Sequence, residues 1–327
     1  MSVFKLRPIF KEYIWGGTRL IEEYGKECGF EKLAESWELA CRSDGMNTSE
    51  NGDLKDRTLG EIIRLSSGQI LGSRCRGMEF PILIKLIDAT DDLSVQVHPD
   101  DEYSLSHEGE PGKTEMWYVI DCKQDSQIIY GLKNEITKAE LIQALNDNRL
   151  SELVNRVRVK KGDVFYIPSG TLHAIGKGIV VAEIQQNSNI TYRVFDYNRL
   201  GKDGKPRELH IQKAVEVINT RPTEVTKHFP AVKCKGFEYT LLVKCRYFTT
   251  VRFDVEDKVV LDIDGQSFAH ILMLSGEGLI SGLEAKKGNS FFIAASSGRT
   301  EIKGHCSFIL TRTGCEEGID KLVEKPR

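Results

Sequence analysis

Short runs of β-forming residues, separated by clusters of Gly, Asp, Asn and Ser, follow one another along most of this 327-residue chain. Runs of about four to eight such residues between turn signals predict β-strands. Many short strands of this kind favour a sandwich or a barrel. The expected strands span residues 81–88, 115–121, 126–130, 164–167, 179–185, 191–196, 239–243, 248–253, 270–274, 290–294 and 307–311.

Two capping boxes predict helices among these strands. Thr58 precedes Glu61 by three residues, Thr137 precedes Glu140 by the same spacing, and each pair leads into an apolar run. In such a pair the hydroxyl and the carboxylate satisfy free amides at a helix N-terminus. Apolar periodicity predicts one more helix. The expected helical segments lie near residues 58–70, 137–157 and 208–218.

The chain is long enough for two domains of about 100–200 residues each. The polar segment 220–235 contains Pro222 and Pro230 and predicts a linker. We therefore expect one domain over residues 1–230 and a second β domain over residues 236–327. The runs KKGD at 160–163 and KKGN at 286–289 each precede a strand. A local turn explains this similarity, and so do two related barrels.

Composition excludes several classes of protein. The formal net charge of −3 argues against a nucleic-acid binder, which carries a basic excess. No run approaches the roughly 18 apolar residues of a membrane helix, and no secretory signal is visible at the N-terminus. The eight cysteines form no C-x-x-C pair, as a zinc ribbon would require. We expect a cytoplasmic protein with reduced thiols, a monomer or weak homodimer, that binds no nucleic acid or membrane.

The strongest local signal is the run GDVFYIPSGTLH from Gly162 to His173. A glycine turn leads into a strand, and a Pro-x-Gly turn then presents a histidine. The spacing resembles the second cupin motif, G-x5-P-x-G-x2-H, whose histidine binds a metal. A histidine is more often structural than ligating, but this setting favours a ligand.

Two further segments place polar side chains on strands. Ser94, Gln96 and His98 alternate along one segment and would share a strand face. Their alternative interpretation is a solvated edge strand. Lys113 and Glu115 likewise share a face at the start of an apolar strand, where they could form a simple surface ion pair. A carboxylate entering an apolar strand is costly to bury unless it is paired or coordinated.

Together, Gln96, His98, Glu115 and His173 offer two imidazoles, one carboxylate and one amide oxygen. This ligand set suits zinc, although Mn, Fe or Co would also fit. The absence of thiolates from the set favours a catalytic site over a structural one.

Six segments in one order give the chain a wider resemblance. They are YIWGG at 13–17, ESWELA at 35–40, QVHP at 96–99, GKTEMWY at 112–118, PSGTLHA at 168–174 and EIQQNSNITYRVFD at 183–196. Together they resemble the type I mannose-6-phosphate isomerase family in its short bacterial form, over about residues 1–215. The region after Phe237 matches weakly, and we expect His270 and His305 there to be ordinary residues of a β domain.

The resemblance implies a mostly β fold: a cupin (RmlC-like jelly-roll) barrel with a small helical insertion, then a degenerate cupin-like domain without metal. It implies an isomerase that interconverts mannose 6-phosphate and fructose 6-phosphate through an enediol and holds one Zn²⁺ per chain. The implied metal ligands are Gln96, His98, Glu115 and His173, the implied catalytic residue is Arg193, and the implied substrate contacts are Lys85, Ser94, Lys113 and Glu183.

Arg193 stays cationic at any working pH and can stabilise an enediolate. Its alternative role is an ion pair with Asp196, which the odd spacing disfavours because it places the two side chains on opposite strand faces. The general base stays open: Glu183 is a base, a proton shuttle or a hydroxyl contact.

Two other functions share these residues. A cupin Fe(II) oxygenase would use the same ligands but has no use for several inward-facing lysines. A non-catalytic regulator would bind the sugar phosphate without converting it. Because cupins host many functions, the fold alone cannot choose among them.

Overall fold

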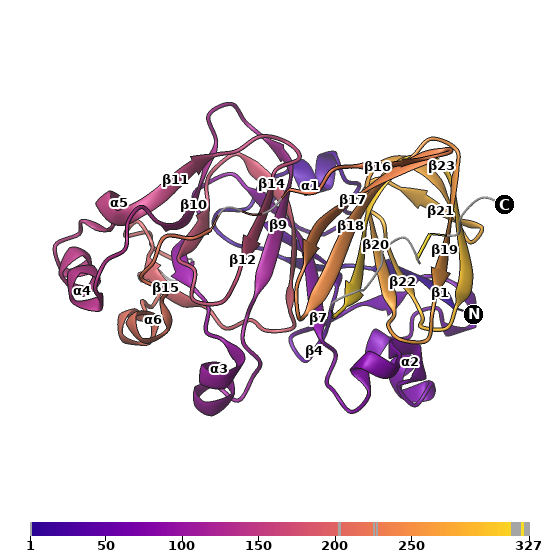
Figure 1. The fold of residues 1–327 in the computed structure, drawn as a ribbon, viewed down its shortest axis with the longest axis horizontal. Helices are drawn as coiled ribbons and strands as arrows, with labels where there is room; N and C mark the ends of the chain where they lie inside the picture. The colour runs from indigo at the N-terminus through magenta and orange to yellow at the C-terminus, as the bar shows by residue number, and fades with distance from the viewer. Residues whose placement is uncertain (1, 202–203, 225, 227, 315–321, 324–327) are drawn as a thin grey trace.

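The computed structural model describes the chain except residues 1, 202–203, 225, 227, 315–321 and 324–327. Two bodies of antiparallel strands lie side by side, and helices lie at the periphery (Figure 1). Each strand expected from the sequence overlaps an observed one. The mostly β fold is therefore confirmed.

The first body consists of two facing sheets. One has the spatial order β12 (Val164–Ile167), β9 (Glu115–Cys122), β14 (Ile179–Gln186), β7 (Ile82–Ala89), β3 (Glu35–Leu39) and β2 (Ile9–Lys11). The other has the order β11 (Val154–Arg158), β10 (Gln127–Leu132), β13 (His173–Ile175), β8 (Val95–Val97) and β15 (Tyr192–Phe195). Apolar side chains from both sheets, including Trp117, Val119 and Ile128, fill part of the space between them.

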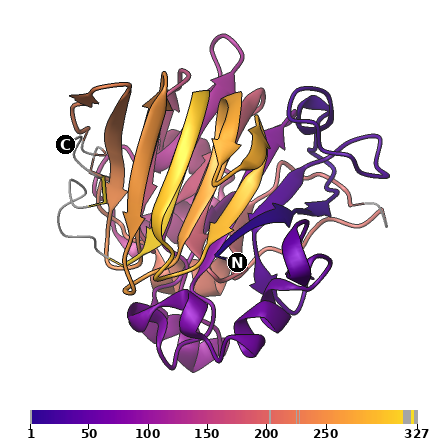
Figure 2. The same ribbon diagram turned by 90° about the vertical axis from the view of Figure 1, so that its right-hand side faces the viewer.

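The second body is a ten-stranded sheet, which faces the viewer in Figure 2. Its order is β16 (Val232–Cys234), β17 (Phe237–Lys244), β18 (Phe248–Val255), β23 (Gly298–Thr313), β20 (Ala269–Ile280), β22 (Ser290–Ile293), β1 (Val3–Arg7) and β6 (Thr48–Ser49). In addition, β19 (Lys258–Ile263) pairs with β23, and β21 (Leu283–Lys286) pairs with β20. A separate hairpin joins β4 (Cys41–Arg42) and β5 (Gly45–Met46).

The six-stranded sheet is buried on both faces. Along β9, Trp117 and Val119 face the interior of the first body, whereas Met116 and Tyr118 pack against the ten-stranded sheet. This alternation follows from the two-residue period of a strand. The strands that carry inward-facing side chains are therefore fixed from both sides.

Helices cover the outer face of the five-stranded sheet. They are α4 (Lys138–Asn146), α5 (Leu150–Leu153) and α6 (Ile211–Val217), whose apolar side chains pack on the sheet (Figure 1). The other helical elements are α1 (Arg19–Glu22), α2 (Leu59–Leu65), α3 (Asp101–His107), η1 (Gly52–Leu54), η2 (Gln69–Leu71) and η3 (Ser73–Cys75). Both predicted capping boxes are confirmed, at the starts of α2 and α4. None of the helices described here is long and apolar enough to span a membrane.

Two local expectations need correction. Residues 208–210 precede helix α6 and run beside β15, where the amide of His210 donates to the carbonyl of Arg193. The end of the expected linker is strand β16, because Val232–Cys234 pairs with β17. Helix α3 follows β8 directly, and the Asp100 carboxylate caps it by accepting from the Tyr103 amide.

The N-terminal strand belongs to the second body. β1 pairs with β22 in antiparallel register, with Val3 opposite Ile293. The N-terminal strand therefore extends the sheet that the C-terminal part of the chain forms. A domain boundary at residues 230–236 stays a prediction. Any such boundary leaves β1 in the same sheet as the strands that follow residue 236.

His270 offers a test of how the second body is packed. Its side chain is fully buried on β20, and burial lowers the pKa of its imidazole to about 3. Between about pH 6.5 and pH 3 the unfolded chain therefore binds a proton that the folded chain excludes, so stability falls as the pH falls. We expect His270 alone to lower the free energy of unfolding by about 2 kcal/mol when the pH falls from 7 to 5.

Urea unfolding of the wild type and of His270→Leu at pH 7 and pH 5 measures this contribution. The wild type should lose more stability on acidification than the variant, even if the variant starts lower. Parallel losses in the two proteins would contradict a buried neutral imidazole.

Candidate functional site

His98, Glu115 and His173 converge between the two sheets of the first body. Nε2 of His173 lies 3.3 Å from Oε1 of Glu115, and Nε2 of His98 lies 3.5 Å from Oε2. The three side chains are almost fully buried, and their potential ligand atoms all lie within 4.8 Å of one another. These residues can hold one metal ion.

The Pro-x-Gly turn brings the two histidines together. Gly170 has a φ of 83°, which an L side chain rarely adopts, and its amide donates to the carbonyl of His98 over 2.8 Å. His173 then begins β13 and lies opposite Gln96 of β8. The glycine in the motif is thus required by the backbone that connects the two imidazoles.

Both imidazoles present Nε2 to the centre of the site. Nδ1 of His98 lies 2.8 Å from the carbonyl oxygen of Ile190, and Nδ1 of His173 lies 2.8 Å from that of Thr171. A carbonyl accepts only, so Nδ1 carries the proton and Nε2 keeps its lone pair. Burial lowers the pKa of His173 to about 4 and that of His98 well below its usual value. Both rings are therefore neutral at neutral pH, as ligation requires.

Glu115 is the acidic member of the three candidate ligands. Neither of its buried carboxylate oxygens accepts a well-directed hydrogen bond from the described residues. Burial, with a smaller contribution from Glu183, raises its pKa to about 7. A buried carboxylate in this state is stabilised by a nearby cation, so the residues present fit a divalent metal ion.

Lys113 and Gln96 border the three candidate ligands. Nζ of Lys113 lies 2.7 Å from Oε2 of Glu115 and 3.1 Å from Nε2 of His98. Nε2 of Gln96 lies 3.4 Å from Nε2 of His173. Nζ of Lys113 also lies 4.0 Å from Oε1 of Glu183.

A cavity of about 350 Å³ opens beside these residues. The five-stranded sheet contributes a row of cross-strand neighbours, His173, Gln96 and Arg193, and the last two line the cavity. The facing sheet contributes a second row that lines it, Lys85, Glu183 and Trp117. The expected substrate contacts Lys85, Ser94, Lys113 and Glu183 all lie on this cavity.

Glu183 is held as an ionised carboxylate at the cavity wall. The indole of Trp117 donates to its Oε2 over 2.9 Å, and Nζ of Lys85 lies 3.5 Å from its Oε1. Burial acts to raise the pKa of Glu183, but Lys113 and Lys85 outweigh it and lower the pKa. Burial likewise acts to lower the pKa of Lys85, and Glu35 and Glu183 reverse the effect, so that it is raised.

Arg193 reaches the same cavity from β15. Its Nε donates to the Ser94 hydroxyl over 3.2 Å, and its Nη1 donates to the Glu208 carbonyl over 2.9 Å. The carboxylate of Asp196 pairs with Arg199 and Arg207 rather than with Arg193. Glu183 lies on β14, in the sheet opposite the one that carries Arg193.

The cavity residues that were not assigned from the sequence include Glu35, Arg207 and His210. Glu35 accepts from the Trp37 indole and lies 3.5 Å from Nζ of Lys85. Glu35 lies in ESWELA at 35–40, one of the six segments that resemble the family, and this could have identified it as a site residue. His210 lies in the segment 208–218 that was expected to be helical, and Arg207 directly precedes it. Only the fold brings these residues beside β15.

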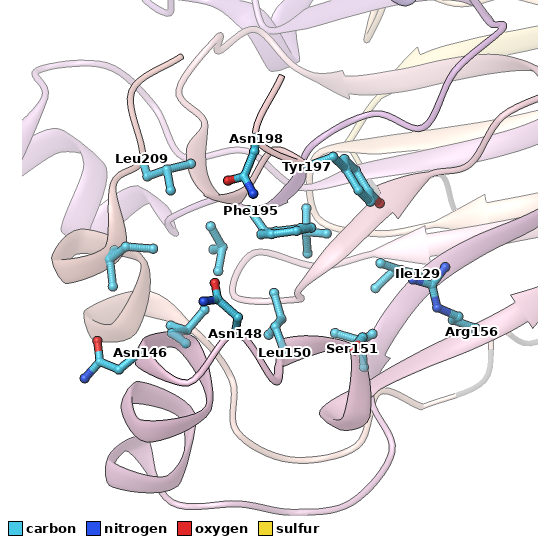
Figure 3. Close-up of a pocket in the computed structure, with 15 residues that line it drawn as sticks. Ile129, Asn146, Asn148, Leu150, Ser151, Arg156, Phe195, Tyr197, Asn198 and Leu209 are labelled. Atoms are coloured by element: carbon cyan, nitrogen blue, oxygen red, sulfur yellow. The ribbon is translucent and has the colours of Figure 1, made fainter. Parts of the chain in front are cut away.

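A second cavity, of about 210 Å³, lies on the outer face of the five-stranded sheet. Val95, Ile129 and Val194 line it together with side chains of the helical region, such as Leu150 and Leu209 (Figure 3). Its lining contains no carboxylate or histidine and none of the expected site residues. The expected substrate contacts therefore lie on the polar cavity of about 350 Å³ and not on this one.

Two family models match the chain. The phosphomannose isomerase type I catalytic domain matches residues 3–113, and the mannose-6-phosphate isomerase cupin domain matches residues 238–313. The second match lies in the ten-stranded sheet.

Curated relatives match nearly the whole chain. It is 42% identical to mannose-6-phosphate isomerase ManA of Bacillus subtilis over 315 residues, covering 93% of this chain and 97% of the relative. It is 39% identical over 275 residues to the mannose-6-phosphate isomerase of Streptococcus mutans, covering 83% and 84% respectively.

Solved structures extend the comparison to the fold. The crystal structure of the Bacillus subtilis mannose 6-phosphate isomerase has a TM-score of 0.89 and 38% identity, over 95% of this chain and 99% of that one. A variant phosphomannose isomerase from Salmonella typhimurium has a TM-score of 0.76 at 18% identity, over 96% and 100%, which shows a shared fold. The expected cupin fold is thus confirmed.

Proposed function

Because this chain belongs to the type I phosphomannose isomerase family, we propose that it interconverts mannose 6-phosphate and fructose 6-phosphate through an enediol. The curated relatives that cover the chain support this reaction over the oxygenase and regulator alternatives. The observation that carries the proposal is the polar cavity, which joins three candidate metal ligands to Lys85, Glu183 and Arg193.

We propose that His98, Glu115 and His173 hold one Zn²⁺ ion, with the amide oxygen of Gln96 as a fourth ligand. The Gln96 side chain is close enough to His173 to join the set after rotation of its amide. Bound zinc would act as a Lewis acid toward the oxygens on C1 and C2 of the sugar.

The remaining residues handle charge and protons. The Arg193 guanidinium, always charged, stabilises negative charge on the enediolate. Glu183 is ionised and faces the cavity, so it can take the carbon-bound proton and return it to the neighbouring carbon. Lys85 and Lys113 keep that carboxylate charged, and they and Ser94 offer hydrogen bonds to sugar hydroxyls.

The metal dependence has a direct test. Treatment with EDTA should remove the metal and abolish fructose 6-phosphate formation in a coupled assay, and added Zn²⁺ should restore it. Elemental analysis before and after treatment records how much metal is bound. Full turnover by protein shown to be metal-free would refute the role of the metal, and oxygen uptake would point to the oxygenase.

The proposal extends to the localisation, the oligomeric state and the partner of the enzyme. We propose a cytoplasmic monomer or weak homodimer whose partner is a small sugar phosphate. Light scattering over a range of protein concentrations tests the oligomeric state.

A further inference from the structure

The cavity holds more positive charge than the isomerisation itself requires. Four permanent cations line it: Lys85, Lys113, Arg193 and Arg207. The two lysines are almost fully buried and already neighbour carboxylates, Lys85 at Glu35 and Glu183 and Lys113 at Glu115. A phosphate dianion placed against them would face those carboxylates as well, at a cost in repulsion. The two arginines are the better partners for such a group.

Arg207 is held at the cavity by a bidentate ion pair. Its Nε lies 2.7 Å from Oδ2 of Asp196, and its Nη2 lies 2.5 Å from Oδ1. A guanidinium has five N–H donors, so this pair leaves others for a ligand. The side chain is 25% exposed, whereas Asp196 is 5% exposed. The carboxylate thus fixes a guanidinium that still reaches solvent at the edge of the cavity.

The position of Arg207 suits the far end of a sugar phosphate. Arg193 lies on β15, two strands from His173, which is roughly 10 Å at the usual strand spacing. The segment that follows Arg207 runs along β15 on the side away from β8, through the contacts of Glu208 and His210 with Arg193. Arg207 therefore enters the cavity from the edge farthest from the candidate metal ligands.

The guanidinium groups of Arg193 and Arg207 also repel each other electrostatically. After burial, the charge of Arg207 is the largest cause that lowers the pKa of Arg193. A phosphate dianion bound to Arg207 would relieve this repulsion.

We infer that Arg207, oriented by Asp196, binds the 6-phosphate of the substrate and so makes the enzyme selective for phosphorylated sugars. This inference rests on the proposed isomerase function. It assigns Arg207 to substrate binding, whereas Arg193 acts on the enediolate.

The test compares binding of mannitol 6-phosphate and of mannitol, which lack the carbonyl and cannot react. Isothermal titration measures both affinities for the wild type and for Arg207→Gln. We expect Arg207→Gln to bind mannitol 6-phosphate about 10- to 100-fold more weakly, as for loss of a charge-assisted hydrogen bond. Its affinity for mannitol and its metal content should stay as in the wild type.

Arg199→Gln is the matched control. Arg199 pairs with the same Asp196 carboxylate, at 2.6 Å, but does not line the cavity. We expect it to bind mannitol 6-phosphate as the wild type does. An equal loss in both variants would overturn the inference, because the effect would then arise from Asp196.

Steady-state kinetics provide an independent test of the contact between Arg207 and the phosphate. In Arg207→Gln the KM for mannose 6-phosphate should rise about 10-fold or more with a much smaller change in kcat, and Arg207→Lys should recover part of the loss. Wild-type KM in Arg207→Gln, or a fall in kcat alone, would refute the phosphate contact. If the wild type itself failed to convert mannose 6-phosphate, the proposed function would fail, while titration would still measure the phosphate contact.

Discussion

Replacing His173 by alanine should remove the metal and reduce isomerase activity by at least about 10³-fold. His173 supplies one of three buried ligands, and its loss leaves Glu115 without one of its closest polar neighbours. Loss of a single charge-stabilising donor already costs about 10²- to 10³-fold in kcat. The measurements are elemental analysis and the coupled assay on the purified variant.

His270→Ala is the control for this experiment. It removes another fully buried histidine, which lies on β20 of the second body and outside the cluster of three candidate ligands. It should lower stability yet keep metal and turnover at temperatures where it is folded. If His173→Ala retained a full complement of metal, the assignment of His173 as a ligand would be wrong.

Arg193→Ala should keep its metal but turn over at least about 10²-fold more slowly. The guanidinium stands on the cavity wall beside Gln96 and contacts none of the three buried candidate ligands. Its removal therefore takes away charge stabilisation without dismantling the metal site. The relevant measurements are kcat and bound metal in the same preparation.

Arg193→Lys adds a sharper comparison. It keeps the positive charge but loses the planar fork that contacts both Ser94 and Glu208, so it should recover only part of kcat. A kcat near that of the wild type in Arg193→Ala would remove this residue from the mechanism. A loss of metal in that variant would instead assign it a structural role.

Local signals in the sequence were sufficient for much of the site. A Pro-x-Gly turn before His173 and the two-residue alternation in Gln96–His98 and Lys113–Glu115 depend only on neighbouring residues. Such short-range rules hold wherever the strand is placed, which is why these side chains could be predicted to share a strand face. The capping boxes at Thr58 and Thr137 belong to the same class.

Long-range pairing decided the rest. The sequence by itself determined many of the strands and which of their side chains share a face. Only the tertiary structure decided that Glu183 faces Arg193 from the opposite sheet, that β1 completes the second body, and that Arg207 reaches the cavity. Pairing between distant strands depends on burial summed over whole sheets, and no local pattern encodes that sum.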